Sequence, residues 1–204
     1  MHKLNSRQAL LASRLSESEI KFFLDHGAEV NQTAVVKGPL PIIYNQFASK
    51  LNIGPHTVLN SDNNTSYVQI VSPVKFALGK SAEIVVGEHC DLNGCAITAY
   101  KSVHVGSYVQ IGPATWITDT DLHVLDPSMR RKQLDGSAYD HALVRTAPVR
   151  IENDVWIGAN VMILKGVNIG RGSVIGAGSI VVDDVPPFSL AGGNPARVVG
   201  KTVD

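Results

Sequence analysis

A period of six residues in the aliphatic positions constrains the fold of this chain more than any other feature. Six positions with this spacing each carry a β-branched aliphatic side chain: Ile151, Ile157, Ile163, Ile169, Ile175 and Val181. A shorter block with the same period lies upstream, at Val105, Ile111 and Ile117. Glycine directly follows several of these residues, as at Gly158, where it relieves steric crowding at a turn. Repetition at a short fixed period indicates a solenoid whose units pack against their neighbours.

The length of the unit predicts the shape of the solenoid. Six residues suffice for one short strand and one corner, so three units close a triangular coil of about 18 residues. One aliphatic residue of each unit points inward and stacks on its counterparts in the next coils, because branched side chains suit a pleated surface. The composition agrees, since 44% of the residues are hydrophobic but only 6% are aromatic, which indicates an aliphatic core. We therefore predict an all-β fold, a parallel β-helix of six-residue repeats.

Signals near both ends of the chain mark the limits of the repeats. Ser16 and Glu19 have the spacing of a capping box, which predicts a short helix from about Glu17 to His26. Near the other end, the pair Pro186-Pro187 cannot continue a central strand. We expect the stack of coils to end there.

The chain upstream of the clear repeats is less regular. Residues 29–75 hold strand-like runs, such as 34–36 and 67–71, that are separated by prolines. We therefore predict two parts: residues 1–75, an N-terminal segment with the short helix and irregular strands, and residues 76–204, the β-helix domain.

Charge and cysteine content exclude several classes of function. Acidic and basic residues balance at 18 each, which argues against nucleic acid or a membrane surface as a partner. Cys90 and Cys95 are too few for a disulfide framework or a tetrahedral metal site, so we expect buried thiols in a reducing compartment. The first residues do not resemble a signal peptide, and no run approaches the ~20 apolar residues that span a bilayer. The expected location is cytoplasmic.

A long interruption of the repeat carries most of the polar candidates. Ile117 and Ile151 lie 34 residues apart where one step needs six, so residues 119–147 form an extruded loop. Irregular backbone costs conformational entropy, and such loops on rigid scaffolds commonly carry binding or catalytic residues. The alternative is a surface insertion without a role.

Several segments together resemble a known family. They are VGSYVQIGP at 105–113, ITDTDLHVLDP at 117–127, NDVWIGANV at 153–161, IGAGS at 175–179 and GNPAR at 193–197. As a set they resemble the hexapeptide-repeat acetyltransferases, and most closely the acetyltransferases of maltose, galactosides and cell-envelope sugars. The similarity covers about residues 78–200. It implies a left-handed β-helix, a homotrimer with active sites at subunit interfaces, and acetyl-CoA as co-substrate. The activity it implies is O-acetyl transfer to a hydroxyl of a sugar or glycan precursor.

The resemblance also implies roles for particular residues. In such enzymes the histidine that opens the loop is the general base, and His123 holds that place. Removing the proton of a weakly nucleophilic hydroxyl is the step that acyl transfer from a thioester needs, and neutral imidazole suits it. His141, in the same loop, is the alternative base. Asp119 and Asp121 are candidates for orienting the base or binding the acceptor, and Asn93 is a candidate acceptor ligand.

The candidates for binding CoA lie toward the C-terminus. The resemblance places Trp156, Ala159, Ala177, Arg197 and Lys201 along the cofactor groove, with the alanines leaving room for the pantetheine arm and the cations meeting phosphates. Packing between subunits is an equal alternative for Trp156. The sequence departs from its relatives at residues 182–184, where they usually carry a lysine.

Three other functions are alternatives to O-acetylation. N-acetylation of an amino sugar uses the same donor and the same fold. A β-helix scaffold without enzymatic activity is the second alternative. A zinc carbonic anhydrase on the same helix needs three histidine ligands, and the repeats contain no histidine pair with the short ligand spacing, so we expect no metal.

Overall fold

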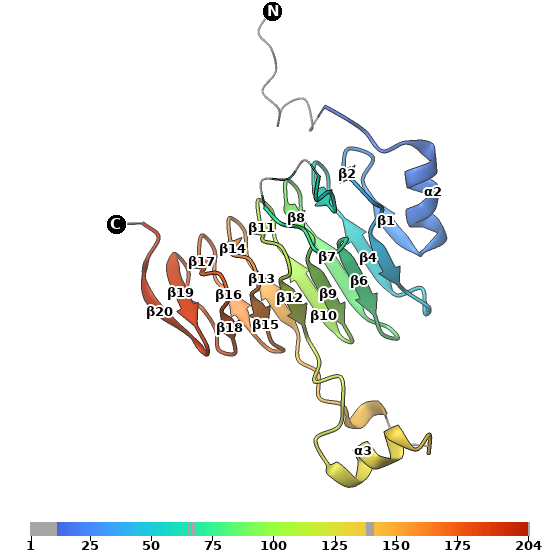
Figure 1. Cartoon of the computed structure of the whole chain (residues 1–204), viewed down its shortest axis with the longest axis vertical. Coiled ribbons are helices and arrows are strands. Elements are labelled where there is room, and N and C mark those ends of the chain that lie inside the picture. The colour runs from blue at the N-terminus through green and yellow to red at the C-terminus, as the bar shows by residue number, and fades with distance from the viewer. Residues whose placement is uncertain (1–11, 65, 67, 138–140, 204) are drawn as a thin grey trace, which may run out of the picture.

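The computed structural model describes residues 12–64, 66, 68–137 and 141–203. Its strands form three sheets that wrap around a common axis (Figure 1). Sheet A contains β1 (Ala28–Val30), β4 (Lys50–Ile53), β7 (Glu83–Val86), β10 (Ser102–Val105), β13 (Val149–Ile151) and β16 (Asn168–Ile169). Sheet B contains β2 (Val35–Lys37), β5 (Val58–Asn60), β8 (Asp91–Asn93), β11 (Gln110–Ile111), β14 (Trp156–Ile157), β17 (Val174–Ile175), β19 (Ser189–Gly193) and β20 (Ala196–Lys201). Sheet C contains β3 (Ile42–Tyr44), β6 (Lys75–Leu78), β9 (Ala96–Ala99), β12 (Trp116–Thr118), β15 (Met162–Ile163) and β18 (Ile180–Val181).

The order of the strands confirms the predicted parallel β-helix. From β1 to β18, successive strands enter sheets A, B and C in turn, and each pairs in parallel with the strand one coil away. The predicted ladder is in register, since Ile151 pairs with Ile169 and Ile157 with Ile175. These four side chains are at most 1% exposed. Burying each of these side chains contributes about 1.5–3 kcal/mol to the stability of the fold. A single coil cannot bury them, so the core depends on the stacking of successive coils.

The β-helix begins at Ala28, well before residue 76. β1 pairs with β4 and β4 pairs with β7, so residues 28–60 form coils of the same stack as the rest. The period is hidden there because the corners differ in length, although Leu51 and Leu59 still point inward. The run 67–71 forms no strand in its described residues 68–71, and Tyr67 lies outside the described residues. This run belongs instead to a connection between β5 and β6.

Both ends of the stack are closed by other elements. The helix α2 (Glu17–Asp25) begins with the predicted capping box between Ser16 and Glu19 and covers the first coil with the fully buried Phe23 (Figure 1). His26 is its C-cap, one residue beyond the helix. At the other end β19 pairs in parallel with β17 and antiparallel with β20. No helix among the described residues is long and apolar enough to cross a membrane.

Both thiols are buried in the column, as expected. Cys90 and Cys95 are unpaired and at most 1% exposed, and burial raises the pKa of Cys90 to about 11 and that of Cys95 to about 12. Because the thiolate is the reactive form, we predict that a disulfide reagent such as dithionitrobenzoate labels neither thiol of the native protein at pH 7.5. In guanidinium both react, giving two labels per chain. Rapid labelling of the native protein would contradict the burial of these cysteines.

Candidate active site

The long insertion leaves the column at the corner between β12 of sheet C and β13 of sheet A, and Figure 1 shows it extending away from the coils. It contains the helix α3 (Pro127–Leu134), which the sequence analysis did not predict, and a short 3₁₀ helix at His141–Leu143. Its two arms are joined at the base by an antiparallel bridge between Thr120 and Thr146. The predicted excursion over 119–147 is thereby confirmed, with a base that is held by backbone hydrogen bonds.

Asp119 anchors this base. Its carboxylate accepts hydrogen bonds from the backbone N–H groups of Tyr100 and Lys101, both at 2.7 Å, and its side chain is 0% exposed. Burial raises the pKa of Asp119, although the backbone hydrogen bonds act in the opposite direction. A carboxylate that is occupied and buried in this way does not reach an acceptor. Asp119 therefore supports the corner, and the predicted acceptor role finds no support in this geometry.

His123 follows on a tight turn. Leu122 has a φ of +62°, and the backbone N–H of His123 donates to the carbonyl of Asp121 at 2.7 Å. The His123 side chain is exposed, and none of the residues described by the structure bonds to its imidazole. The ring is thus free to accept a proton from an incoming group. The side chain of His141, the alternative base, lies outside the described residues.

Asp121 forms an ion pair with Lys165, a residue that the sequence does not single out. Lys165 lies in the corner after β15, and its Nζ is 2.6 Å from Oδ1 of Asp121. Both side chains are partly buried. The pair ties the first residues of the loop to the next coil. Lys165 carried no sequence signal because a lone lysine at a corner is normally solvated.

This pair has a testable consequence for the position of His123. We predict that Lys165→Met and Asp121→Asn each lower kcat/KM for transfer by about fivefold, and that the double variant loses little more than either single variant. Steady-state kinetics of the three variants measure this coupling. Additive losses would show that Lys165 and Asp121 act independently. Lys132→Met, on the far helix of the loop, is the control and is expected to leave kcat/KM unchanged.

A second group of candidates lies at the corner from sheet B to sheet C. Asn93 is the last residue of β8, and Ala159 and Ala177 follow β14 and β17, so the three lie along one edge of the column. The coils approach closely there: a Cβ added to Gly158 would lie 2.7 Å from the backbone nitrogen of Ala177. Ala159 is half-buried and Ala177 exposed, which leaves a shallow row free of large side chains.

Asn93 has two partners at this edge. Its side-chain oxygen accepts from Asn60 Nδ2 at 2.8 Å, and its own Nδ2 donates to the carbonyl of Ile111 at 3.2 Å. Asn60 also bonds to Ser66, in the connection between β5 and β6, at 3.1 Å. Asn60 has no recognisable signal in the sequence, because the irregular corners hide the period of its coil.

The remaining cofactor candidates belong to the same sheet. Trp156 is 55% exposed on the outer face of β14. Arg197 and Lys201 are exposed on β20, which adds to sheet B at the end of the stack. Arg197 pairs with Asp183, in the segment between β18 and β19, at 3.0 Å. A phosphate at Arg197 would have to displace or share that contact.

The candidates therefore occupy two different edges of one chain. His123 and Asp121 lie at the corner from sheet C to sheet A, whereas Asn93 and the alanine row lie at the corner from sheet B to sheet C. A triangular column separates these corners, so a single chain does not bring the imidazole to the alanine row.

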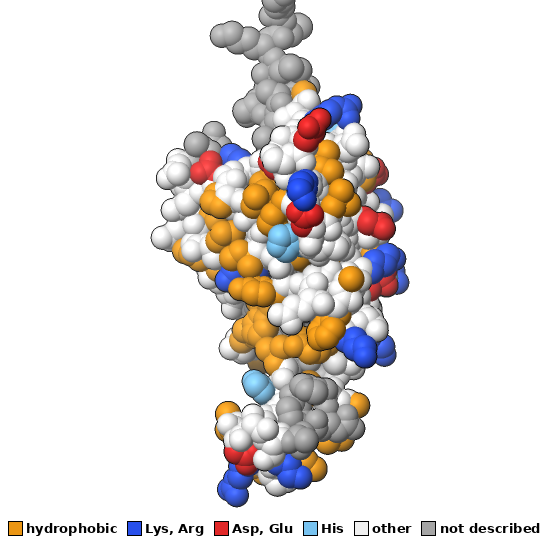
Figure 2. Space-filling model, turned by 90° about the vertical axis from the view of Figure 1, so that its right-hand side faces the viewer, with side chains coloured by type: hydrophobic (Ala, Val, Ile, Leu, Met, Phe, Trp, Pro, Cys, Tyr) orange, Lys and Arg blue, Asp and Glu red, His pale blue; other side chains and the backbone are white. Residues whose placement is uncertain are grey.

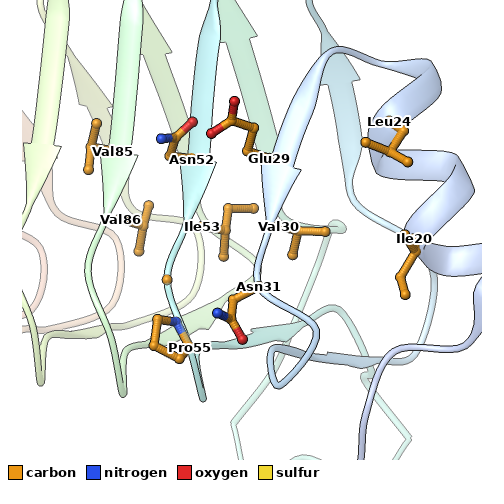
Figure 3. Close-up of a pocket in the computed structure, with 11 residues that line it drawn as sticks. Ile20, Leu24, Glu29, Val30, Asn31, Asn52, Ile53, Pro55, Val85 and Val86 are labelled. Carbon is orange, nitrogen blue, oxygen red and sulfur yellow. The ribbon is translucent and has the colours of Figure 1, made fainter.

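The pocket beside α2 is not part of either group. It is lined by the outer faces of β1, β4 and β7 and by Ile20 and Leu24 of the helix, and it holds about 520 Å³ (Figure 3). Figure 3 shows Glu29, Asn31 and Asn52 as its polar side chains, and its lining contains no histidine or cysteine. Within the described ranges, no group of three or more His, Cys, Asp or Glu side chains is placed to hold a metal ion.

Comparison with known families decides the classification. The family model of the bacterial transferase hexapeptide, described as six repeats, matches residues 148–183, which span the regular coils from sheet A through β18. These residues therefore resemble the hexapeptide repeats of bacterial transferases. The chain is similar to the galactoside O-acetyltransferase of Lactococcus lactis, with 36% identity over 62% of this chain and 56% of that protein. The galactoside O-acetyltransferase of Escherichia coli is 36% identical over 65% and 60%.

Solved hexapeptide-repeat structures cover more of the chain. A hexapeptide-repeat acetyltransferase of Vibrio cholerae, crystallised with acetyl-CoA, is 28% identical and covers 97% of this chain and 84% of that one, with a TM-score of 0.50. An N-acyltransferase of Bacillus cereus has a TM-score of 0.64 over 94% and 91% but is 16% identical, so it shows the shared fold alone. The chain spans 56–60% of the length of the two galactoside O-acetyltransferases.

Proposed function

We propose that this hexapeptide-repeat protein is an acetyl-CoA-dependent O-acetyltransferase that acts on a hydroxyl of a sugar or glycan precursor. The observation that carries the proposal is the exposed, unpaired imidazole of His123 at the base of a loop anchored to the column. The similarity to galactoside O-acetyltransferases supports a hydroxyl acceptor, and the acetyl-CoA complex of the Vibrio cholerae relative supports the donor.

The chemistry follows from a neutral imidazole beside a thioester. The acceptor oxygen attacks the acetyl carbonyl carbon while His123 takes the hydroxyl proton, which raises the nucleophilicity of the oxygen. When the tetrahedral intermediate collapses, the carbon–sulfur bond breaks and the protonated imidazole returns the proton to the sulfur of CoA. Transfer is direct within a ternary complex, so the protein needs no nucleophile of its own, and both thiols are buried.

The proposed assembly is a homotrimer with active sites at subunit interfaces. The loop edge of one chain would face the alanine row of its neighbour, so that His123 meets the pantetheine arm along Ala159 and Ala177. Their small side chains leave room for that arm, while Trp156 would flank it and Arg197 and Lys201 would meet phosphates. Asn93, on the same edge as the alanines, would bind the acceptor. A cyclic trimer brings the two edges together three times with one interface.

An acceptor screen tests this proposal. Purified protein is incubated with acetyl-CoA and either methyl galactoside or galactosamine, and release of CoA is followed with a thiol reagent. We expect release with the hydroxyl acceptor, an acetyl ester as product, and saturation in both substrates. Faster turnover of galactosamine to an amide would identify an N-acetyltransferase instead. No CoA binding by calorimetry would identify a β-helix without this activity.

A further inference from the structure

The groove beside α2, on the outer face of sheet A, has apolar walls that reach the surface. It holds about 520 Å³ (Figure 3). Leu24 of the helix is 64% exposed at its rim, and Ile20 and Val85 are partly buried along its sides. Figure 2, which views the molecule from the α2 end, shows hydrophobic side chains gathered at the surface there. Apolar side chains that line a concave site commonly mark a ligand.

Two hydrogen-bond acceptors lie next to each other in this groove. Glu29 of β1 and Asn52 of β4 are directly paired residues of neighbouring strands, so they lie about 4.8 Å apart on one face of the sheet (Figure 3). The side chain of Glu29 is exposed, and none of the residues that the structure describes forms an ion pair with its carboxylate. The side-chain oxygen of Asn52 is buried without a hydrogen-bond partner. An unpaired buried acceptor is costly, which indicates that a donor is missing at this position.

The missing donor does not come from the walls of the groove. Among the described residues that line it, none is Lys, Arg or His. The oxygen of Asn31 already accepts hydrogen bonds from the backbone N–H and the hydroxyl of Thr33. Two remaining side-chain oxygens are too few for Ca²⁺ or Mg²⁺, which take about six or more oxygen ligands. A primary ammonium group carries three N–H donors and one positive charge, so it complements a carboxylate and an amide oxygen together.

We propose that this groove binds a small molecule that carries a primary ammonium group on an apolar body. The ammonium group donates to the carboxylate of Glu29 and to the buried oxygen of Asn52. The apolar body packs against Leu24 and Val85. The site is separate from the proposed active site, because β1, β4 and β7 belong to earlier coils than the extruded loop, which follows β12. Its occupancy does not depend on the proposed activity.

Titrations of the full-length protein with three small molecules, followed by ligand-detected NMR at pH 7, test this inference. Hexylamine carries both features, methylamine carries the ammonium group alone, and hexanol carries the apolar chain without the charge. We expect hexylamine to bind about tenfold more tightly than either of the others. Glu29→Gln removes the negative charge and weakens hexylamine binding about fivefold. Glu17→Gln, on the exposed first turn of α2, is the matched control and leaves the affinity unchanged.

A second variant tests the buried oxygen of Asn52. Asn52→Val replaces the unpaired amide with an apolar side chain that suits a strand, so we expect unfolding at a higher urea concentration together with loss of hexylamine binding. A merely structural asparagine would lose stability on the same change, and that result would overturn the inference.

Competition distinguishes this groove from the proposed active site. Saturating CoA and methyl galactoside are expected to leave hexylamine binding unchanged, and displacement by either would place the amine elsewhere and refute the assignment. Equal affinities for hexylamine and hexanol, or wild-type affinity in Glu29→Gln, would show that the groove does not recognise an ammonium group.

Discussion

His123→Ala lowers kcat for acetyl transfer by about 10²–10⁴-fold, the range that a general base supplies, while the protein still folds and binds CoA. The reason is that no described residue near the loop base offers a replacement: Asp119 is buried and occupied, and Asp121 is paired with Lys165. Single-turnover kinetics with acetyl-CoA in excess measure the effect on the chemical step.

Two comparisons make this result specific. His104→Ala removes another outward-facing histidine, on β10 beside Glu83, and is expected to leave kcat within twofold of wild type. His141→Ala tests the other histidine of the loop. If His141→Ala abolished transfer and His123→Ala did not, His141 would be the base and the assignment of His123 would be wrong.

Ile111→Ala destabilises the protein by about 2–5 kcal/mol, because it opens a cavity in the middle of the inward ladder. Ile111 is 0% exposed and pairs in register with Leu92 in one neighbouring coil and Ile157 in the other. The coils cannot move closer to fill the cavity, because their backbones are already in close contact. A Cβ added to Gly112 would lie only 2.6 Å from the backbone nitrogen of Ala159 in the next coil.

Urea unfolding at one fixed protein concentration measures this loss, because oligomer stability depends on concentration. The matched control is Leu134→Ala on α3, where the leucine is 88% exposed and the change is expected to stay within about 0.5 kcal/mol. Equal destabilisation by the two substitutions would show that the ladder is not the source of the stability.

The regular coils could be predicted from the sequence because each inward position repeats at the same interval. The six positions from Ile151 to Val181 that lie six residues apart are all in the core, as are Val105, Ile111 and Ile117. The earlier coils could not be predicted, because the number of residues between inward positions varies there. Leu92 pairs with Ile111 and Ile97 with Ile117, so the corner between these positions is one residue shorter in the earlier coil. A positive φ of +47° at Gly94 permits that tighter turn.

The candidate site was predictable only in part. The position of His123 on an exposed loop base follows from the interruption of the repeat, but the burial of Asp119 does not. By sequence Asp119 is a candidate acceptor ligand because it lies close to His123, the proposed base. Only the fold shows that backbone N–H groups occupy its carboxylate. Lys165 and Asn60 depend on contacts between coils far apart in sequence, which a single sequence does not encode locally.

Subunit complementation tests the central claim most directly. Two inactive chains are made, His123→Ala and Ala159→Trp, the second blocking the alanine row, and they are refolded together with different affinity tags. If His123 of one chain acts at the alanine row of its neighbour, mixed trimers isolated through both tags regain activity, and a random equal mixture reaches about a quarter of the wild-type sites. Mixed trimers that contain both chains and remain inactive would contradict a shared active site.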